Sequence, residues 1–140
     1  MAEQPLAYEE LAHTADLRLR VHGASLAELF AHAAQGMFAL MQCQPAPQAA
    51  PVAQALEIVS YDTTALLVDW LTELLYLSER DGACFERFEI LQLEPGQLVA
   101  QISGRQLGQA ARHIKAVTFS ELDIVRLDSG SYRATITFDV

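Results

Sequence analysis

The stretch Tyr132-Arg133-Ala134-Thr135-Ile136-Thr137-Phe138-Asp139-Val140 ends the sequence and alternates apolar with polar residues. Alternation of this kind is typical of a β-strand with one buried face. Because the pattern reaches the final residue, we expect the α-carboxylate of Val140 to be held in the fold beside the carboxylate of Asp139. Two anionic groups held side by side need a positive partner, since an unpaired buried charge is costly.

A second strand with the same pattern is predicted near the other end of the sequence, at residues 16–22. Leu17, Leu19 and Val21 form its apolar phase, and Asp16 falls on its polar phase. Asp139 falls on the polar phase of the last strand. If the two strands are neighbours, the two carboxylates therefore meet at one end of a sheet.

Two amphipathic helices are predicted between these strands. Ser25 and Glu28 form a capping box that opens the first helix. Its apolar residues recur at helical spacing, namely Leu26, Leu29, Phe30, Ala33, Ala34, Met37, Phe38 and Met41. The second helix is predicted from a cap at Asp62 or Thr63 to about Arg80, with a buried face of Leu66, Leu67, Trp70, Leu71, Leu74 and Leu75.

The remaining sequence predicts strands and two loops. Strands are expected at residues 56–60, 84–93, 98–103, 113–119, 122–127 and 132–139, in addition to the one at 16–22. Residues 42–54 contain three prolines and are expected to form a Pro-rich surface loop, and residues 104–112 a polar loop. We therefore predict one α+β domain over residues 1–140, with two helices packed on mostly antiparallel or mixed sheets of about seven strands.

Composition excludes several classes of protein. The net charge is −9, with 18 acidic and 9 basic residues, which argues against direct nucleic-acid binding. No apolar run has the ~20 residues that span a bilayer, and the N-terminus lacks the pattern of a signal peptide. We expect a cytoplasmic protein without a membrane role, in which Cys43 and Cys84 are free thiols because they lack CxxC spacing.

Three carboxylates are candidate ligands for a hard cation: those of Asp16 and Asp139 and the α-carboxylate of Val140. Oxygen ligands suit Ca²⁺ or Mg²⁺. The alternative from the residues alone is that Asp16 caps a turn and Asp139 is simply exposed. The histidines lack the spacing of a zinc site, and His13 is expected to order the loop before Asp16.

Several segments of the sequence match one known family in order. They are Tyr8-Glu9 with His13-Thr14-Ala15-Asp16, Ser25 to Phe30, Ala33 to Phe38, Leu67 to Tyr76, Ile114 to Thr118, Tyr132 to Thr135 and Asp139-Val140. Any one matching segment is weak evidence, whereas all of them in order are specific. Through these segments the sequence resembles the archease family along nearly its whole length.

The resemblance implies a small non-catalytic protein that activates an RtcB-type RNA ligase. Such ligases join RNA ends bearing a 3′-phosphate or 2′,3′-cyclic phosphate to 5′-hydroxyl ends with GTP, in tRNA splicing and RNA repair. An archease is expected to promote guanylylation of the ligase and multiple turnover, as a transient partner.

The resemblance also implies roles for individual residues. Asp16, Asp139 and the carboxylate of Val140 match the family's divalent-metal ligands, usually seen with Ca²⁺. Lys115 becomes a candidate contact to the ligase, its nucleotide or a carboxylate near the metal. Asp69 and Glu73 become candidate partner contacts, although a solvated helix face is their ordinary explanation. Ser120 stands where family members commonly carry a histidine, so a role resting on that histidine is not expected in this protein.

Two other functions stay open at this point. Asp16, Asp139 and a metal-bound water could hydrolyse phosphoesters, with Asp69 or Glu73 as the base. Alternatively, the protein is a calcium-stabilised adaptor without a ligase role. The sequence has no GxSxG motif, phosphate-binding glycine loop or nucleotidyltransferase lysine motif, and so no nucleophile for an enzyme.

Overall fold

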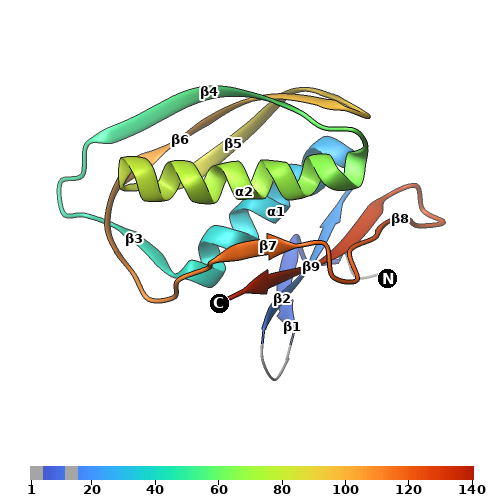
Figure 1. The fold of residues 1–140 in the computed structure, drawn as a ribbon, viewed down its shortest axis with the longest axis horizontal. Coiled ribbons are helices and arrows are strands. Elements are labelled where there is room, and N and C mark those ends of the chain that lie inside the picture. Colours follow the sequence, from blue (N-terminus) through green and yellow to red (C-terminus); the bar gives the residue numbers. More distant parts are fainter. Residues whose placement is uncertain (1–4, 12–15) are drawn as a thin grey trace.

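The computed structural model describes residues 5–11 and 16–140 and consists of two antiparallel sheets with two helices between them (Figure 1). The helices are α1 (Leu26–Met41) and α2 (Thr63–Asp81). The strands are β1 (Tyr8–Leu11), β2 (Leu17–Gly23), β3 (Cys43–Pro45), β4 (Pro51–Val59), β5 (Ala83–Glu94), β6 (Gln97–Ala110), β7 (Ala116–Thr118), β8 (Ile124–Arg126) and β9 (Tyr132–Asp139). The predicted α+β class is confirmed.

The first sheet is built around the last strand. Its order is β1-β2-β9-β7, and β8 also pairs with β9. Strand β2 pairs with β9 from Leu17↔Phe138 to Gly23↔Tyr132, while β7 pairs with β9 from Ala116↔Asp139 to Thr118↔Thr137. Strand β9 therefore lies in the interior of the sheet, between strands from opposite ends of the chain.

The second sheet is built around β6, which pairs with β3, β4 and β5. Helix α1 lies between the two sheets and packs against β2 on one side and β5 on the other (Figure 1). Helix α2 lies beside α1 and contacts β4, β5 and β7. Neither helix is long and apolar enough to cross a membrane.

Both helices begin with the predicted capping residues. Ser25 Oγ accepts a hydrogen bond from the Glu28 N–H at 3.1 Å, and Glu28 in turn accepts one from the Ala24 N–H at 3.1 Å. Asp62 is the N-cap of α2, because its carboxylate accepts from the Ala65 N–H at 2.7 Å. Gly82 ends α2 at φ 59°, a left-handed conformation that glycine adopts without steric cost.

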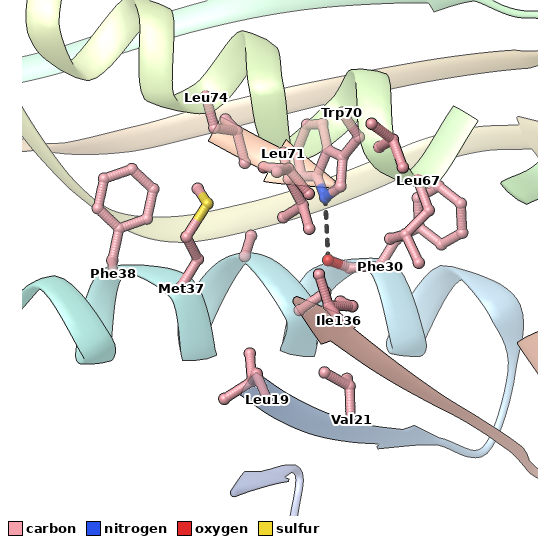
Figure 2. Close-up of a cluster of buried hydrophobic side chains, with 14 of the residues drawn as sticks. Leu19, Val21, Phe30, Met37, Phe38, Leu67, Trp70, Leu71, Leu74 and Ile136 are labelled. Atoms are coloured by element: carbon pink, nitrogen blue, oxygen red, sulfur yellow. Dashed lines mark hydrogen bonds between the residues drawn. The ribbon is translucent and has the colours of Figure 1, made fainter. Parts of the chain in front are cut away.

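Trp70 joins the two helices at the centre of the core. Its side chain is fully buried, and its indole Nε1–H donates to the carbonyl oxygen of Phe30 on α1 at 2.9 Å (Figure 2). Leu19 and Val21 from β2 and Ile136 from β9 lie on the opposite side of α1 (Figure 2). Helix α1 therefore connects the Trp70 cluster with the inner face of the first sheet.

Both predicted loops are wrong over most of their length. Residues 42–54 contain β3 and the first part of β4, because Pro45 ends a strand at a register shift and Pro51 begins one. Proline is compatible with these positions, since a strand end or an edge does not need its missing N–H. Residues 104–110 belong to β6, which extends the strand predicted at 98–103. The described residues form nine strands rather than seven because β1 and β3 were not predicted.

The prediction of free thiols is also wrong. Cys43 and Cys84 form a disulfide, with their Cα atoms 5.9 Å apart. Cys43 lies on β3 directly after α1, and Cys84 lies on β5 directly after α2. Both strands pair with β6, which brings the two side chains together although they are far apart in sequence.

Replacing Trp70 with phenylalanine tests the connection between the helices. The variant loses the donor to Phe30 and leaves unfilled volume in the core, so we expect the free energy of unfolding to fall by about 2–3 kcal/mol. Denaturant unfolding measures the change. Tyr76→Phe on the exposed flank of α2 is the control and should change stability by less than about 0.5 kcal/mol. Equal stability of both variants would contradict this packing.

Candidate metal centre

The end of β9 lies beside the residues that precede β2 and β7. The last β2–β9 pair is Leu17↔Phe138, and extending this register by one residue places Asp16 opposite Asp139. On the other side, β7 begins with the pair Ala116↔Asp139. The Lys115 N–H donates to the Asp139 carbonyl oxygen at 2.8 Å. Asp16, Asp139 and Lys115 therefore meet at one end of the sheet, beside Val140.

Strand β9 is packed against the core as far as Phe138, the residue before Asp139. Phe138 is fully buried, and the Thr137 carbonyl oxygen accepts from Thr118 Oγ1 at 3.2 Å. By contrast, Asp139 and Lys115 are exposed, and Asp16 is half-buried. The polar groups thus lie where an apolar strand emerges into solvent, which gives them fixed positions and access to a ligand.

The arrangement offers oxygen ligands on one face of the sheet. Directly opposed residues of an antiparallel pair point to the same face, with Cβ atoms roughly 4.5–5.5 Å apart. The Asp16 and Asp139 carboxylates can therefore approach one cation from neighbouring strands. Within residues 5–11 and 16–140, no group of three or more His, Cys, Asp or Glu side chains is placed to hold a metal. A third protein ligand from these residues would therefore be a main-chain, hydroxyl or amide oxygen.

Lys115 also borders a groove beside α2. The groove has a volume of about 450 Å³ and is lined on the helix side by residues that include Tyr76 and Glu79. Arg112 and His113 line it from the segment before β7. The Arg112 guanidinium also bonds to Glu10 on β1 at 3.2 Å. This segment was not predicted as part of a site, although Arg, His and Lys occur together within residues 112–115.

Asp69 and Glu73 occupy a different place from the sheet end. They lie on the exposed face of α2 and line a groove against β4, together with Glu57. Asp69 accepts a hydrogen bond from Ser60 Oγ. His13 lies outside the described residues, so its predicted role at the Asp16 loop stays a prediction.

The pKa shifts that the structure shows arise from ion pairs on the surface. A hydrogen bond from Arg105 lowers the pKa of Glu86, and a hydrogen bond from Arg80 lowers the pKa of Asp81. Both carboxylates are held ionised by an adjacent guanidinium, as in ordinary structural ion pairs. These shifts therefore do not mark a general acid or base.

Comparison with known proteins identifies the family. Residues 8–140 match the model of the Archease protein family. The chain belongs to the archease family. The protein archease of Methanosarcina acetivorans is 34% identical over 148 aligned residues, with 100% of both chains covered. The protein archease of Methanosarcina barkeri is 32% identical over the same length and coverage.

Solved structures agree with this assignment. The solution structure of Methanobacterium thermoautotrophicum protein 1598 has a TM-score of 0.73 and 28% identity, covering 96% of this chain and 99% of its own. The crystal structure of a Thermotoga maritima archease, described as a possible chaperone, has a TM-score of 0.66. That likeness covers 100% of this chain and 98% of the other at 18% identity, so it bears on the fold alone.

Proposed function

We propose that this archease-family protein activates an RtcB-type RNA ligase, promoting GTP-dependent guanylylation of the ligase and so multiple turnover. The observation that supports the proposal most is the polar end of β9, where Asp139 lies between Asp16, the residue before β2, and Lys115, the residue before β7. Asp139 and Lys115 are exposed, Asp16 is half-buried, and the buried Phe138 anchors the strand beside them, so the site is accessible to a partner. The protein is a cofactor of the ligase in this proposal and performs no chemistry of its own.

A divalent cation is the proposed ligand of this site. Asp16, Asp139 and the carboxylate of Val140 would hold it, with carbonyl oxygens and water in the remaining positions. Ca²⁺ fits best, because it accepts six to eight oxygens in flexible geometry, whereas Mg²⁺ needs a stricter octahedron. When bound, the cation would neutralise the carboxylates of two opposed strand positions and offer a positive site to a partner's phosphate or carboxylate.

Lys115 is the proposed partner contact at the same site. Its backbone is fixed by the hydrogen bond to Asp139, while its side chain is exposed. The ammonium group can therefore reach a phosphate or carboxylate of the ligase complex without disturbing β7. Asp69 and Glu73 lie apart, in the groove against β4, and are proposed as a separate contact surface.

Activation requires preferential binding to one state of the ligase. A protein that binds the guanylylation-competent conformation, or its transition state, more tightly than the resting state raises the rate by that difference in affinity. The net charge of −9 favours a basic ligase surface as the partner and disfavours direct binding to RNA. A cytoplasmic location, where tRNA is processed, is part of the same proposal.

Calcium binding tests the proposed ligands. Ca²⁺ at 100 times its Kd should stabilise the protein by about 2.7 kcal/mol, because it binds only the folded state. Asp139→Asn should lose most of this stabilisation. In EDTA the variant should be at least as stable as the original protein, since a charge opposite Asp16 is gone. Thermal unfolding with and without Ca²⁺ measures both effects.

Asp123→Asn, an exposed carboxylate in the segment between β7 and β8, is the matched control for this experiment. It should respond to Ca²⁺ as the original protein does. Equal Ca²⁺ stabilisation of the Asp139 and Asp123 variants would reject the proposed ligand set while leaving the fold unaffected.

A sealing assay tests the ligase role. A cognate ligase with GTP and RNA ends bearing 3′-phosphate and 5′-hydroxyl should form more product per ligase when this protein is added below stoichiometry. Asp139→Asn and Lys115→Ala should each reduce the gain in product by at least about tenfold. Loss of a group that supports a metal site typically lowers activity by about 10- to 100-fold. Asp123→Asn should retain it.

Two results would favour the alternatives. Phosphate release from the RNA ends by the purified protein alone would indicate a metal-dependent hydrolase. Stabilisation by Ca²⁺ without any effect on sealing would indicate a calcium-stabilised adaptor.

A further inference from the structure

Strand β4 is a long edge of the second sheet. It runs for nine residues from Pro51 to Val59, and its hydrogen-bonded partner within the described part of the chain is β6. The strand arches across the outside of the molecule, with α2 below it (Figure 1). One row of its backbone N–H and C=O groups therefore faces away from the sheet, as at any strand edge.

This edge lacks most features that prevent strand addition. Natural edges are commonly blocked by several charges, an internal proline or a bulge. In β4 the one charged residue is Glu57, the proline is the first residue, and the pairing with β6 is regular over all nine positions. The outward residues Ala53 and Ala55 are small, so side chains do not screen the backbone.

The end of the edge is apolar and exposed. Val59 is 72% exposed, and Tyr61, two residues further on, is 85% exposed. Large exposed apolar and aromatic side chains beside an open edge offer an anchor for a residue of an added strand. Their position at the edge distinguishes them from isolated surface hydrophobics.

A groove beside the edge selects the charge of the ligand. It lies between β4 and α2, has a volume of about 370 Å³ and is lined by Glu57, Ile58, Val59, Asp69, Thr72 and Glu73. Three of these six residues are carboxylates and none is basic. Glu57 accepts from Gln97 Nε2 at 3.1 Å, and Asp69 accepts from Ser60 Oγ, so two carboxylates are held at the edge.

We propose that β4 binds an extended basic peptide segment of a partner protein, which adds to the sheet as a further strand. The backbone of the segment would pair with the open edge of β4, and alternate Lys or Arg side chains would reach Asp69 and Glu73. A second copy of this chain is a poorer occupant, because pairing two β4 strands brings the carboxylates of both grooves together. This docking edge includes Asp69 and Glu73, which are proposed above as a second contact surface. It is separate from the end of β9, so peptide binding to it is measured independently of cation binding and RNA sealing.

The test uses the full ¹⁵N-labelled chain and a blocked eight-residue peptide of alternating Lys and Val. We expect the peptide to shift the amide signals of β4 and of Asp69 and Glu73, and to slow hydrogen exchange along β4. The same peptide with two central valines replaced by proline keeps every charge but loses two ladder donors. It should bind at least about tenfold more weakly, as should a peptide of alternating Glu and Val.

Charge reversal provides the matched variants. Asp69→Lys with Glu73→Lys should weaken binding of the Lys–Val peptide at least about tenfold. Asp123→Lys with Asp128→Lys alters the net charge by the same amount at exposed positions elsewhere and should leave binding unchanged.

Several results would overturn the proposal. These are no binding at millimolar peptide, equal binding of the proline-containing peptide, equal weakening by both pairs of reversals, or protection of β4 by self-association without peptide. The last result would identify a second copy of this chain as the occupant.

Discussion

The pairing of β9 inside the first sheet is the constraint on which the candidate site depends. Backbone hydrogen bonds to β2, β7 and β8 fix the position of the strand along its length. The alternating burial of Ala134, Ile136 and Phe138 fixes which face meets the core, because a slip of one residue would expose all three. Because the pairing and the buried face of β9 are both fixed, Asp139 lies opposite Asp16, the residue before β2, and beside Lys115, the residue before β7.

Much of this arrangement follows from the sequence. The alternation in residues 132–139 predicts both ends of β9 correctly. The same alternation in residues 16–22 predicts both ends of β2 within one residue. The capping residues Ser25 and Asp62 set the starts of the two helices, because each side chain accepts a hydrogen bond from a backbone N–H of the first turn. The alternation predicts that Asp16 and Asp139 lie on the polar faces of their strands. It does not predict that β2 and β9 are neighbours, because strands far apart in sequence pair through tertiary structure.

The errors have a common physical origin. Strand β4 and the second half of β6 carry Pro, Ala, Gln and Gly, which are poor strand formers, and they are strands because their neighbours supply hydrogen bonds. The disulfide between Cys43 and Cys84 depends on the same pairing, since each cysteine follows a helix and enters a strand beside β6. Pairing of this kind depends on tertiary structure, so it cannot be predicted from the residues of one short segment.

Paramagnetic relaxation by Mn²⁺ is the sharpest test of a cation site at the end of β9, because Mn²⁺ takes oxygen ligands as Ca²⁺ does and broadens amide signals near its site. At low Mn²⁺, we expect the amides of Asp16, Asp139, Val140 and Lys115 to broaden before any others, and excess Ca²⁺ to reverse the broadening. Broadening that begins at Glu57, Asp69 and Glu73, or that spreads evenly over the acidic surface, would contradict a cation site at the end of β9.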